Sequence, residues 1–266
     1  MEEVAFDSPA SEICAQLMGL DREMEEMKGD GRKLRLVKDA VLGYQPGDVG
    51  CDWHVDDKVF WPCSDTNVGK VDAGVNVWIT LSDIDCKIGG GLALAKGSHF
   101  KEKWMEKARE VIRAGGPATT CQMAKLDQES WNQLEALKEV HDFAPGDAIF
   151  HNRYLFHKVD PFPKDLEGEG MKHRISLRYM PSDATYEPLS DEAMARDPAV
   201  SEKGLKRGDL LSKAEGYYPQ TWPCRLEEEE KMEVLADPEF ISFGRILKGV
   251  VSAMKKKKEV AVEEKK

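Results

Sequence analysis

Residues 75–100 read VNVWITLSDIDCKIGGGLALAKGSHF, with two strand-like apolar segments on either side of three glycines. Apolar side chains occupy every second position from Val75 to Ile79, which is the period of a strand with one face in a core. The glycines at 89–91 are a turn signal, and residues 92–95 are an apolar run of strand length. The stretch therefore predicts two strands joined by a glycine-containing turn.

The sequence on either side adds more short strands and several helices. Strand-like patterns cover residues 33–46, 71–81, 139–144, 147–157 and 172–180, while helical spacing covers residues 10–28, 100–114 and 128–138. Nothing alternates as a regular βαβ series. The pattern therefore predicts an all-β core, an antiparallel barrel or jelly roll decorated by helices, rather than a doubly wound sheet.

Length and composition fit one domain acting on a small molecule. The chain has 266 residues, 41% of them apolar, which suffices for a full core. We expect a single domain over 1–250, with its β core at about 35–180, a helical extension at about 182–250 and a charged, disordered tail at 251–266. A net charge of −11 opposes nucleic-acid binding, and no apolar run is long enough for a membrane span. We assume a monomer.

The six cysteines do not form a metal-binding or redox motif. They are Cys14, Cys51, Cys63, Cys86, Cys121 and Cys224, and none makes a CxxC pair. The N-terminus is acidic and has no apolar leader. Free thiols in a reducing, cytoplasmic setting are therefore expected.

His54-Val55-Asp56 is a candidate metal-binding motif. In a strand, residues i and i+2 point to the same face, so an imidazole and a carboxylate at this spacing can bind one ion. The motif alone is weak, because a chain with 6 His and 49 acidic residues contains on the order of one such match by chance. A solvent-exposed histidine beside a turn is the simpler interpretation of the motif alone.

A second element strengthens the metal hypothesis. Residues 146–157 read GDAIFHNRYLFH, a turn followed by a strand that is expected to end in His157. Further on, Arg174 and Ser176 share one face of the strand at 172–180. A guanidinium beside a hydroxyl suits a carboxylate ligand, because arginine can donate two parallel hydrogen bonds and the hydroxyl a third.

These pieces resemble the phytanoyl-CoA dioxygenase family of iron(II)- and 2-oxoglutarate-dependent oxygenases. The matching segments, in order, are DWHVDD, VNVWITLSDIDCKIGGGLALAKGSHF, APGDAIFHNRYLFHKVDP and HRISLRYMP. They cover roughly residues 35–180. The second segment, with its glycine turn and a Gly-Ser-His before a helix, is the most specific.

The resemblance implies a double-stranded β-helix, the cupin-like jelly roll, with iron at its open end. His54 and Asp56 match the family's first two metal ligands, and His157 matches the third. Arg174 matches the arginine that binds the far carboxylate of 2-oxoglutarate, Ser176 fits the Arg-x-Ser pair of the wider superfamily, and Trp78 matches a tryptophan lining the co-substrate pocket. The implied cofactor is iron(II), with 2-oxoglutarate and O₂ as co-substrates. The implied reaction is hydroxylation of an aliphatic C–H bond, with release of succinate and CO₂.

The sequence departs from the family pattern after the third ligand. The family often has His-Gly-Ser there, whereas this chain has His157-Lys158-Val159, and the loop before Arg174 is longer than usual. Lys172 and Arg178 share the face of Arg174, so either of them remains an alternative anchor for 2-oxoglutarate. His151 is the alternative third metal ligand.

The substrate side is open. The possible substrate-lining residues are Asp57, Phe60, Trp61 and His99. An acyl-CoA ester would need a cationic cluster, which Lys101, Lys103 and Lys107 could supply on one helix, whereas a free small molecule would not. Two other functions stay possible: a cupin-type metalloenzyme that does not use O₂ (a hydrolase or isomerase), and a catalytically silent metal-binding module.

Overall fold

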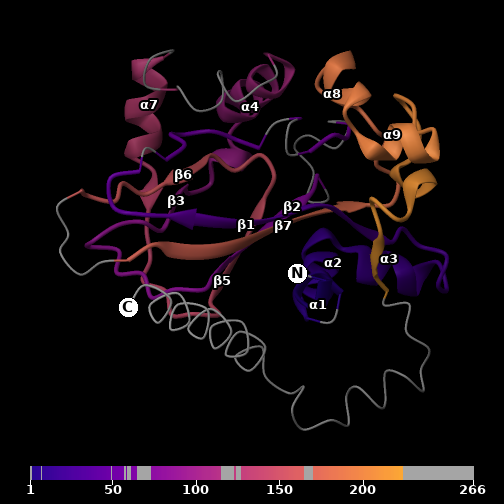
Figure 1. The fold of residues 1–266 in the computed structure, drawn as a ribbon, viewed down its shortest axis with the longest axis horizontal. Helices are drawn as coiled ribbons and strands as arrows, with labels where there is room; N and C mark the ends of the chain where they lie inside the picture. The colour runs from indigo at the N-terminus through magenta and orange to yellow at the C-terminus, as the bar shows by residue number, and fades with distance from the viewer. Residues whose placement is uncertain are drawn as a thin grey trace, which may run out of the picture.

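The structure is a computed structural model that describes residues 2–6, 8–48, 50–56, 58, 61–64, 73–114, 123, 127–164 and 170–223. Two antiparallel sheets form its core (Figure 1). The larger sheet has the order β5 (Ala148–Asn152), β2 (Val75–Thr80), β7 (Lys172–Pro181), β1 (Leu34–Tyr44) and β8 (Gln220–Trp222). The smaller sheet has the order β4 (Lys138–Glu139), β3 (Leu92–Ala95) and β6 (His157–Val159).

The larger sheet packs its outer face on the N-terminal helices. These are α1 (Glu2–Phe6), α2 (Ala10–Met18) and α3 (Leu20–Glu26), which lie together beside the sheet in Figure 1. Every second residue of β2 and β7, from Val75 to Ile79 and from Ile175 to Tyr179, is buried against apolar residues of these helices. This strand period of two is the one that the sequence shows, with one face in the core.

The smaller sheet is covered by a second pair of helices. An apolar cluster joins α4 (Glu102–Ala114) and α7 (Gln128–Glu135) to this sheet. It contains Trp104 of α4 and Leu134 of α7, together with Trp53, Ala93 and Phe156. A 3-10 turn, η1 (Ser98–Phe100), leads into α4. Both helices stand above β3 and β6 in Figure 1. The segments that carry His54 and His157 are therefore held between this helical layer and the interior.

The C-terminal part adds short pieces of structure rather than long helices. It contains α8 (Asp191–Ala195), α9 (Pro198–Lys203), the 3-10 turn η2 (Leu211–Ala214) and then β8, which pairs with β1. The expected helical extension is thus only partly helical over 182–223. The rest of it, and the expected tail, lie outside the described residues.

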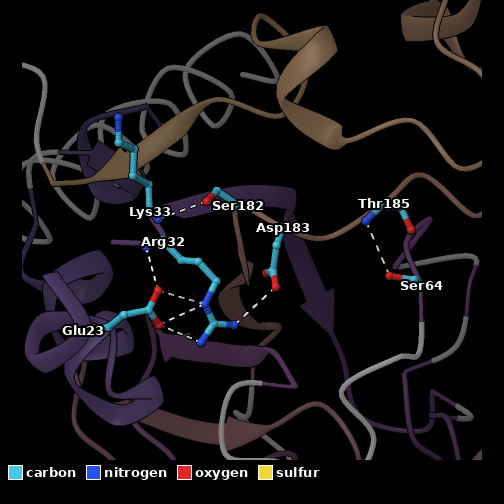
Figure 2. A network of polar contacts seen from close by, with 7 residues as sticks. All are labelled: Glu23, Arg32, Lys33, Ser64, Ser182, Asp183 and Thr185. Carbon is cyan, nitrogen blue, oxygen red and sulfur yellow. Dashed lines mark hydrogen bonds and ion pairs between the residues drawn. The ribbon is translucent and has the colours of Figure 1, made fainter. Parts of the chain in front are cut away.

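Polar contacts join the N-terminal helices to the end of β7 (Figure 2). Arg32, which follows α3, donates from Nε and Nη2 to the carboxylate of Glu23 in α3, and its Nη1 lies 3.4 Å from Asp183 Oδ2. The backbone N–H of Lys33 donates to the Ser182 hydroxyl. These contacts fix the start of β1 beside the end of β7, which are neighbours in the sheet.

Four sequence-based expectations are wrong. The strand expected over 139–144 ends at Glu139, the last residue of β4, and Phe143 forms only an isolated bridge with Ile84. The helix expected over 10–28 is broken at Gly19, whose φ of +74° is a left-handed conformation that glycine adopts without strain. The strand expected over 147–157 ends at Asn152, and His157 begins a new strand after a turn. Cys51 is in a disulfide bond, whereas Cys14, Cys63 and Cys86 are free thiols, as expected.

Two of the cysteines, Cys121 and Cys224, lie outside the described residues. Among the described helices, none is both long and apolar enough to cross a bilayer.

Candidate metal centre

The inner face of the larger sheet carries polar residues in register across its strands. Arg178 of β7 lies opposite Asn76 of β2, and Asn76 lies opposite His151 of β5. Partners in an antiparallel ladder point to the same face, so these side chains form one row. Two further rows follow along β7, first Ser176 with Trp78, then Arg174 with Thr80.

His54, Asp56 and His157 meet beside the first of these rows. One ligand atom from each residue lies within 4.8 Å of the other two, and all three side chains are buried. Asp56 Oδ1 is 4.0 Å from His54 Nε2 and 3.8 Å from His157 Nε2. The backbones of His54 and His157 bond reciprocally through an isolated antiparallel bridge. The structure therefore brings together three residues separated by up to about a hundred positions in sequence.

Backbone carbonyls orient both imidazoles. His54 Nδ1 lies 2.6 Å from the carbonyl oxygen of Asp52, and His157 Nδ1 lies 2.9 Å from that of Leu155. A carbonyl only accepts, so each Nδ1 carries the proton and each Nε2 keeps its lone pair. This partner on the second ring nitrogen is what metal-ligating histidines usually have.

The Asp56 carboxylate is held by one oxygen and free at the other. Its Oδ2 accepts hydrogen bonds from Asn76 Nδ2 at 2.8 Å, Arg178 Nε at 2.9 Å and Trp61 Nε1 at 3.2 Å. Its Oδ1 faces the two Nε2 atoms. One carboxylate oxygen and two imidazole nitrogens therefore point to a common space.

The protonation states of Asp56 and His157 favour metal binding. Burial alone raises the pKa of the Asp56 carboxyl, but Arg178, the two histidines and the Asn76 amide outweigh burial and hold that pKa well below its usual value. Burial and the neighbouring imidazoles hold the pKa of His157 well below its usual value. An ionised carboxylate and neutral imidazoles are the forms in which these side chains bind a metal. The donor set, two nitrogens and one oxygen, fits iron(II).

His151, the alternative third ligand, lies beside the cluster and outside it. Its ring centroid is 4.7 Å from that of His157, and its Nδ1 is 3.0 Å from the Asn152 carbonyl. Burial lowers the pKa of His151 to about 4, so the ring is neutral at physiological pH. The described ligand atoms that converge belong to His157 and not to His151.

The three cationic side chains of β7 differ in their partners. Arg178 is buried and ion-paired with Asp56. Arg174 is partly buried, lies over the Tyr44 ring at 5.5 Å, and forms no ion pair within the described part of the chain. Lys172 Nζ is 5.9 Å from the centre of the Phe162 ring. Arg174 and Arg178 are four residues apart, roughly 13 Å along the strand.

The other predicted site residues fall in different places. Trp78 is buried in the interior between the sheets, with its ring 5.3 Å from that of Phe143. Trp61 is fully buried, and its contact with Asp56 makes it part of the metal centre rather than of an open pocket. His99 lies in η1 with its ring 3.8 Å from Phe100. Asp57 and Phe60 lie outside the described residues.

Lys158, which replaces the family's glycine, has a packing role. Its side chain points away from the metal centre and is buried between Trp53 and Trp131, with Nζ 4.9 Å and 5.2 Å from the two rings. Nζ is ion-paired with Glu135 of α7. Lys158 thus connects α7 to β6, the strand that begins with His157.

Sequence reasoning missed the residues that hold Asp56. Asn76 lies in an otherwise apolar strand, two residues before Trp78 and therefore on the same face. Because buried amides are hydrogen-bonded, an amide at this position is a sequence signal for a polar partner nearby. From the sequence, Arg178 is only an alternative anchor for 2-oxoglutarate. Its partner is 122 residues away in sequence, so no local pattern reveals the pair.

The two sheets and the convergent donor atoms define a jelly-roll protein with a candidate mononuclear metal centre. The family model described as "Phytanoyl-CoA dioxygenase (PhyH)" matches residues 4–161, more than half of the chain. The protein belongs to this family. Iron(II) and 2-oxoglutarate are its cofactor and co-substrate, as the resemblance implied.

Solved structures agree on the fold. The non-heme alpha ketoglutarate dependent epimerase SnoN from nogalamycin biosynthesis superposes with a TM-score of 0.54 at 18% identity, over 83% of this chain and 72% of that one. The carbocyclase SnoK of the same biosynthesis gives 0.55 at 20% identity, over 79% and 67%. At this identity the likeness concerns the fold alone. A comparison with curated proteins found no match.

Proposed function

We propose that the protein is an iron(II)- and 2-oxoglutarate-dependent dioxygenase that hydroxylates an aliphatic C–H bond and releases succinate and CO₂. In this proposal His54 Nε2, Asp56 Oδ1 and His157 Nε2 bind the iron. The observation that carries it is their convergence within 4.8 Å, each with its remaining polar atom already hydrogen-bonded. Such a centre favours metal binding because no ligand has to be reoriented when the ion binds.

Two histidines and one carboxylate leave coordination positions open. Iron(II) bound there would supply the activation of O₂ that oxidises an unreactive C–H bond as 2-oxoglutarate is decarboxylated. The protein's own contribution is geometric and electrostatic: it keeps Asp56 and His157 in their metal-binding protonation states and encloses the ligands between two sheets. Hydroxylation is proposed rather than halogenation, because the Asp56 carboxylate takes the position that a halide would need.

Arg174 and Ser176 are proposed to bind the far carboxylate of 2-oxoglutarate, with Trp78 beside it. Arg174 supports this role because its guanidinium lies on the inner face with an aromatic neighbour and no described ion pair. Burial lowers the pKa of Arg174, which means that its charge is poorly solvated and that an incoming carboxylate is favoured. Arg178 is a poorer anchor, since Asp56 already occupies its Nε.

A free small molecule is the proposed substrate, rather than an acyl-CoA ester. Two of the three lysines expected to suit CoA phosphates lie in α4, and both have other partners. Lys103 donates to the Gln133 side chain, and Lys107 lies 3.4 Å from Asp127 and 3.7 Å from Glu110. A helix face whose cations are shared with carboxylates and amides is a weak site for phosphates.

The test is spectroscopic and anaerobic. Iron(II) and then 2-oxoglutarate are added to the wild type, to His54→Ala and to His141→Ala, an exposed histidine that serves as the matched control. We expect the weak visible charge-transfer band of the iron–2-oxoglutarate chelate in the wild type and in His141→Ala, and its loss in His54→Ala. Absence of the band in folded wild-type protein that binds metal by an independent assay would contradict the proposal.

A further inference from the structure

We propose that Arg178 is a positioning residue that holds Asp56 so that only its Oδ1 can bind the metal. The inference rests on the proposed function, because it concerns the same metal centre. One arginine in the middle of β7 then sets the way in which the carboxylate binds, and so the number of positions left for the co-substrates.

The geometry separates the two carboxylate oxygens. Oδ2 receives three donors from three different segments: Arg178 from β7, Asn76 from β2 and Trp61 from the chain after the motif. A carboxylate oxygen has about two lone pairs, so three donors leave Oδ2 without capacity for a metal. Oδ1 faces His54 and His157, at 4.0 Å and 3.8 Å from their Nε2 atoms.

Arg178 is the charged member of the three donors. Its side chain and that of Asp56 are only 7% and 3% exposed, so the pair is shielded from solvent. A buried carboxylate left without its cation is strongly disfavoured, and it would turn toward other donors or toward the metal. Asn76 and Trp61 contribute direction to the carboxylate but no compensating charge.

The consequence concerns coordination. A carboxylate that binds through both oxygens takes two positions on an ion, whereas one that binds through Oδ1 alone takes one. With two imidazoles, binding through one oxygen leaves three positions of an octahedral ion open for other ligands. Arg178 would therefore keep the centre able to accept a chelating co-substrate and a further small ligand.

The test uses cobalt(II) alone, whose visible spectrum reports its coordination. Arg178→Gln removes the charge, and Arg178→Lys restores the charge without the fork geometry. Arg35→Gln is the matched control, because Arg35 is also a buried, ion-paired arginine, with Glu215 as its partner. Cobalt(II) affinity, the spectrum of the bound ion and the thermal midpoint of the metal-free protein are measured for each variant.

We expect Arg178→Gln to weaken cobalt(II) binding roughly 10- to 100-fold and to change the spectrum, with Arg178→Lys in between. Arg35→Gln should lower the thermal midpoint while leaving affinity and spectrum unchanged, which separates positioning from stability. Wild-type affinity and spectrum in folded Arg178→Gln would overturn the inference. If that variant does not fold, unchanged binding in both Arg178→Lys and Asn76→Ala would overturn it. A wild type that binds no cobalt(II) would instead refute the proposed metal centre itself.

Discussion

Replacing Arg174 by methionine should weaken 2-oxoglutarate binding and leave metal binding intact. Arg174 lies on the same inward face as Arg178, one row beyond Ser176, and it makes no ion pair within the described residues. A buried charge pair that loses one partner costs roughly 2–5 kcal/mol. At about 1.4 kcal/mol per tenfold change, the Kd for 2-oxoglutarate should rise from about 30-fold to a few thousand-fold.

The assay is an anaerobic titration of 2-oxoglutarate into the iron(II)-loaded protein, followed through the charge-transfer band. Arg174→Lys keeps the charge but loses the parallel pair of hydrogen bonds, so its Kd should lie between those of the wild type and Arg174→Met. Lys172→Met is the matched control on the same strand face. If Lys172→Met weakens binding and Arg174→Met does not, Lys172 is the anchor and the reasoning from partners along β7 is refuted.

Two predictions concern the fold. Leu177 is fully buried on the outer face of β7, so Leu177→Ala should lower the free energy of unfolding by about 2–5 kcal/mol in urea denaturation. The control, Val41→Ala on the exposed part of β1, should change it by less than about 0.5 kcal/mol. Equal effects of the two substitutions would contradict the assigned core. Asp127 caps α7, and hydrogen bonds from Ser130 lower its pKa to about 2. Its ionised form therefore stabilises the fold above the unfolded-state value near 3.8, and this contribution is lost as the pH falls toward 2. The wild type should accordingly be more stable than Asp127→Asn at pH 6, with the difference disappearing near pH 2 in denaturation curves of metal-free protein; a difference that persists at low pH would contradict this assignment.

The strands of the core could be predicted because their apolar patterns are local. The run at Leu92–Ala95 becomes β3 with the same bounds, and the pattern from Val75 to Ile79 becomes β2. The break at Gly19 was missed because apolar residues recur at helical spacing on both sides of it, and helical spacing does not report a single left-handed residue. The end of β5 was missed for a similar reason, since residues 153–156 form a turn without a glycine or proline signal.

The metal ligands were predictable and their supports were not. His54 and Asp56 form a local motif, and His157 was found from its place in an ordered set of segments. The donors to Asp56 come from positions whose meaning depends on the fold, because Asn76 and Arg178 are neighbours only through the pairing of β2 with β7. Lys158 shows the same limit: beside a metal ligand in sequence, it points to the opposite face and packs on Trp53.

Strand register ties the stability of the fold to the geometry of the site. Side chains alternate along β7, so the residues that face the N-terminal helices, such as Leu177, alternate with those that face the metal centre, such as Ser176 and Arg178. A shift of one residue would exchange the two sets. It would bury the arginines against the helices without partners, which costs several kcal/mol for each charge. The apolar face toward the helices therefore fixes the spacing between the arginine on Asp56 and the arginine proposed for 2-oxoglutarate. Mutations in that apolar face that loosen β7 should accordingly weaken metal and co-substrate binding together, even though they touch neither.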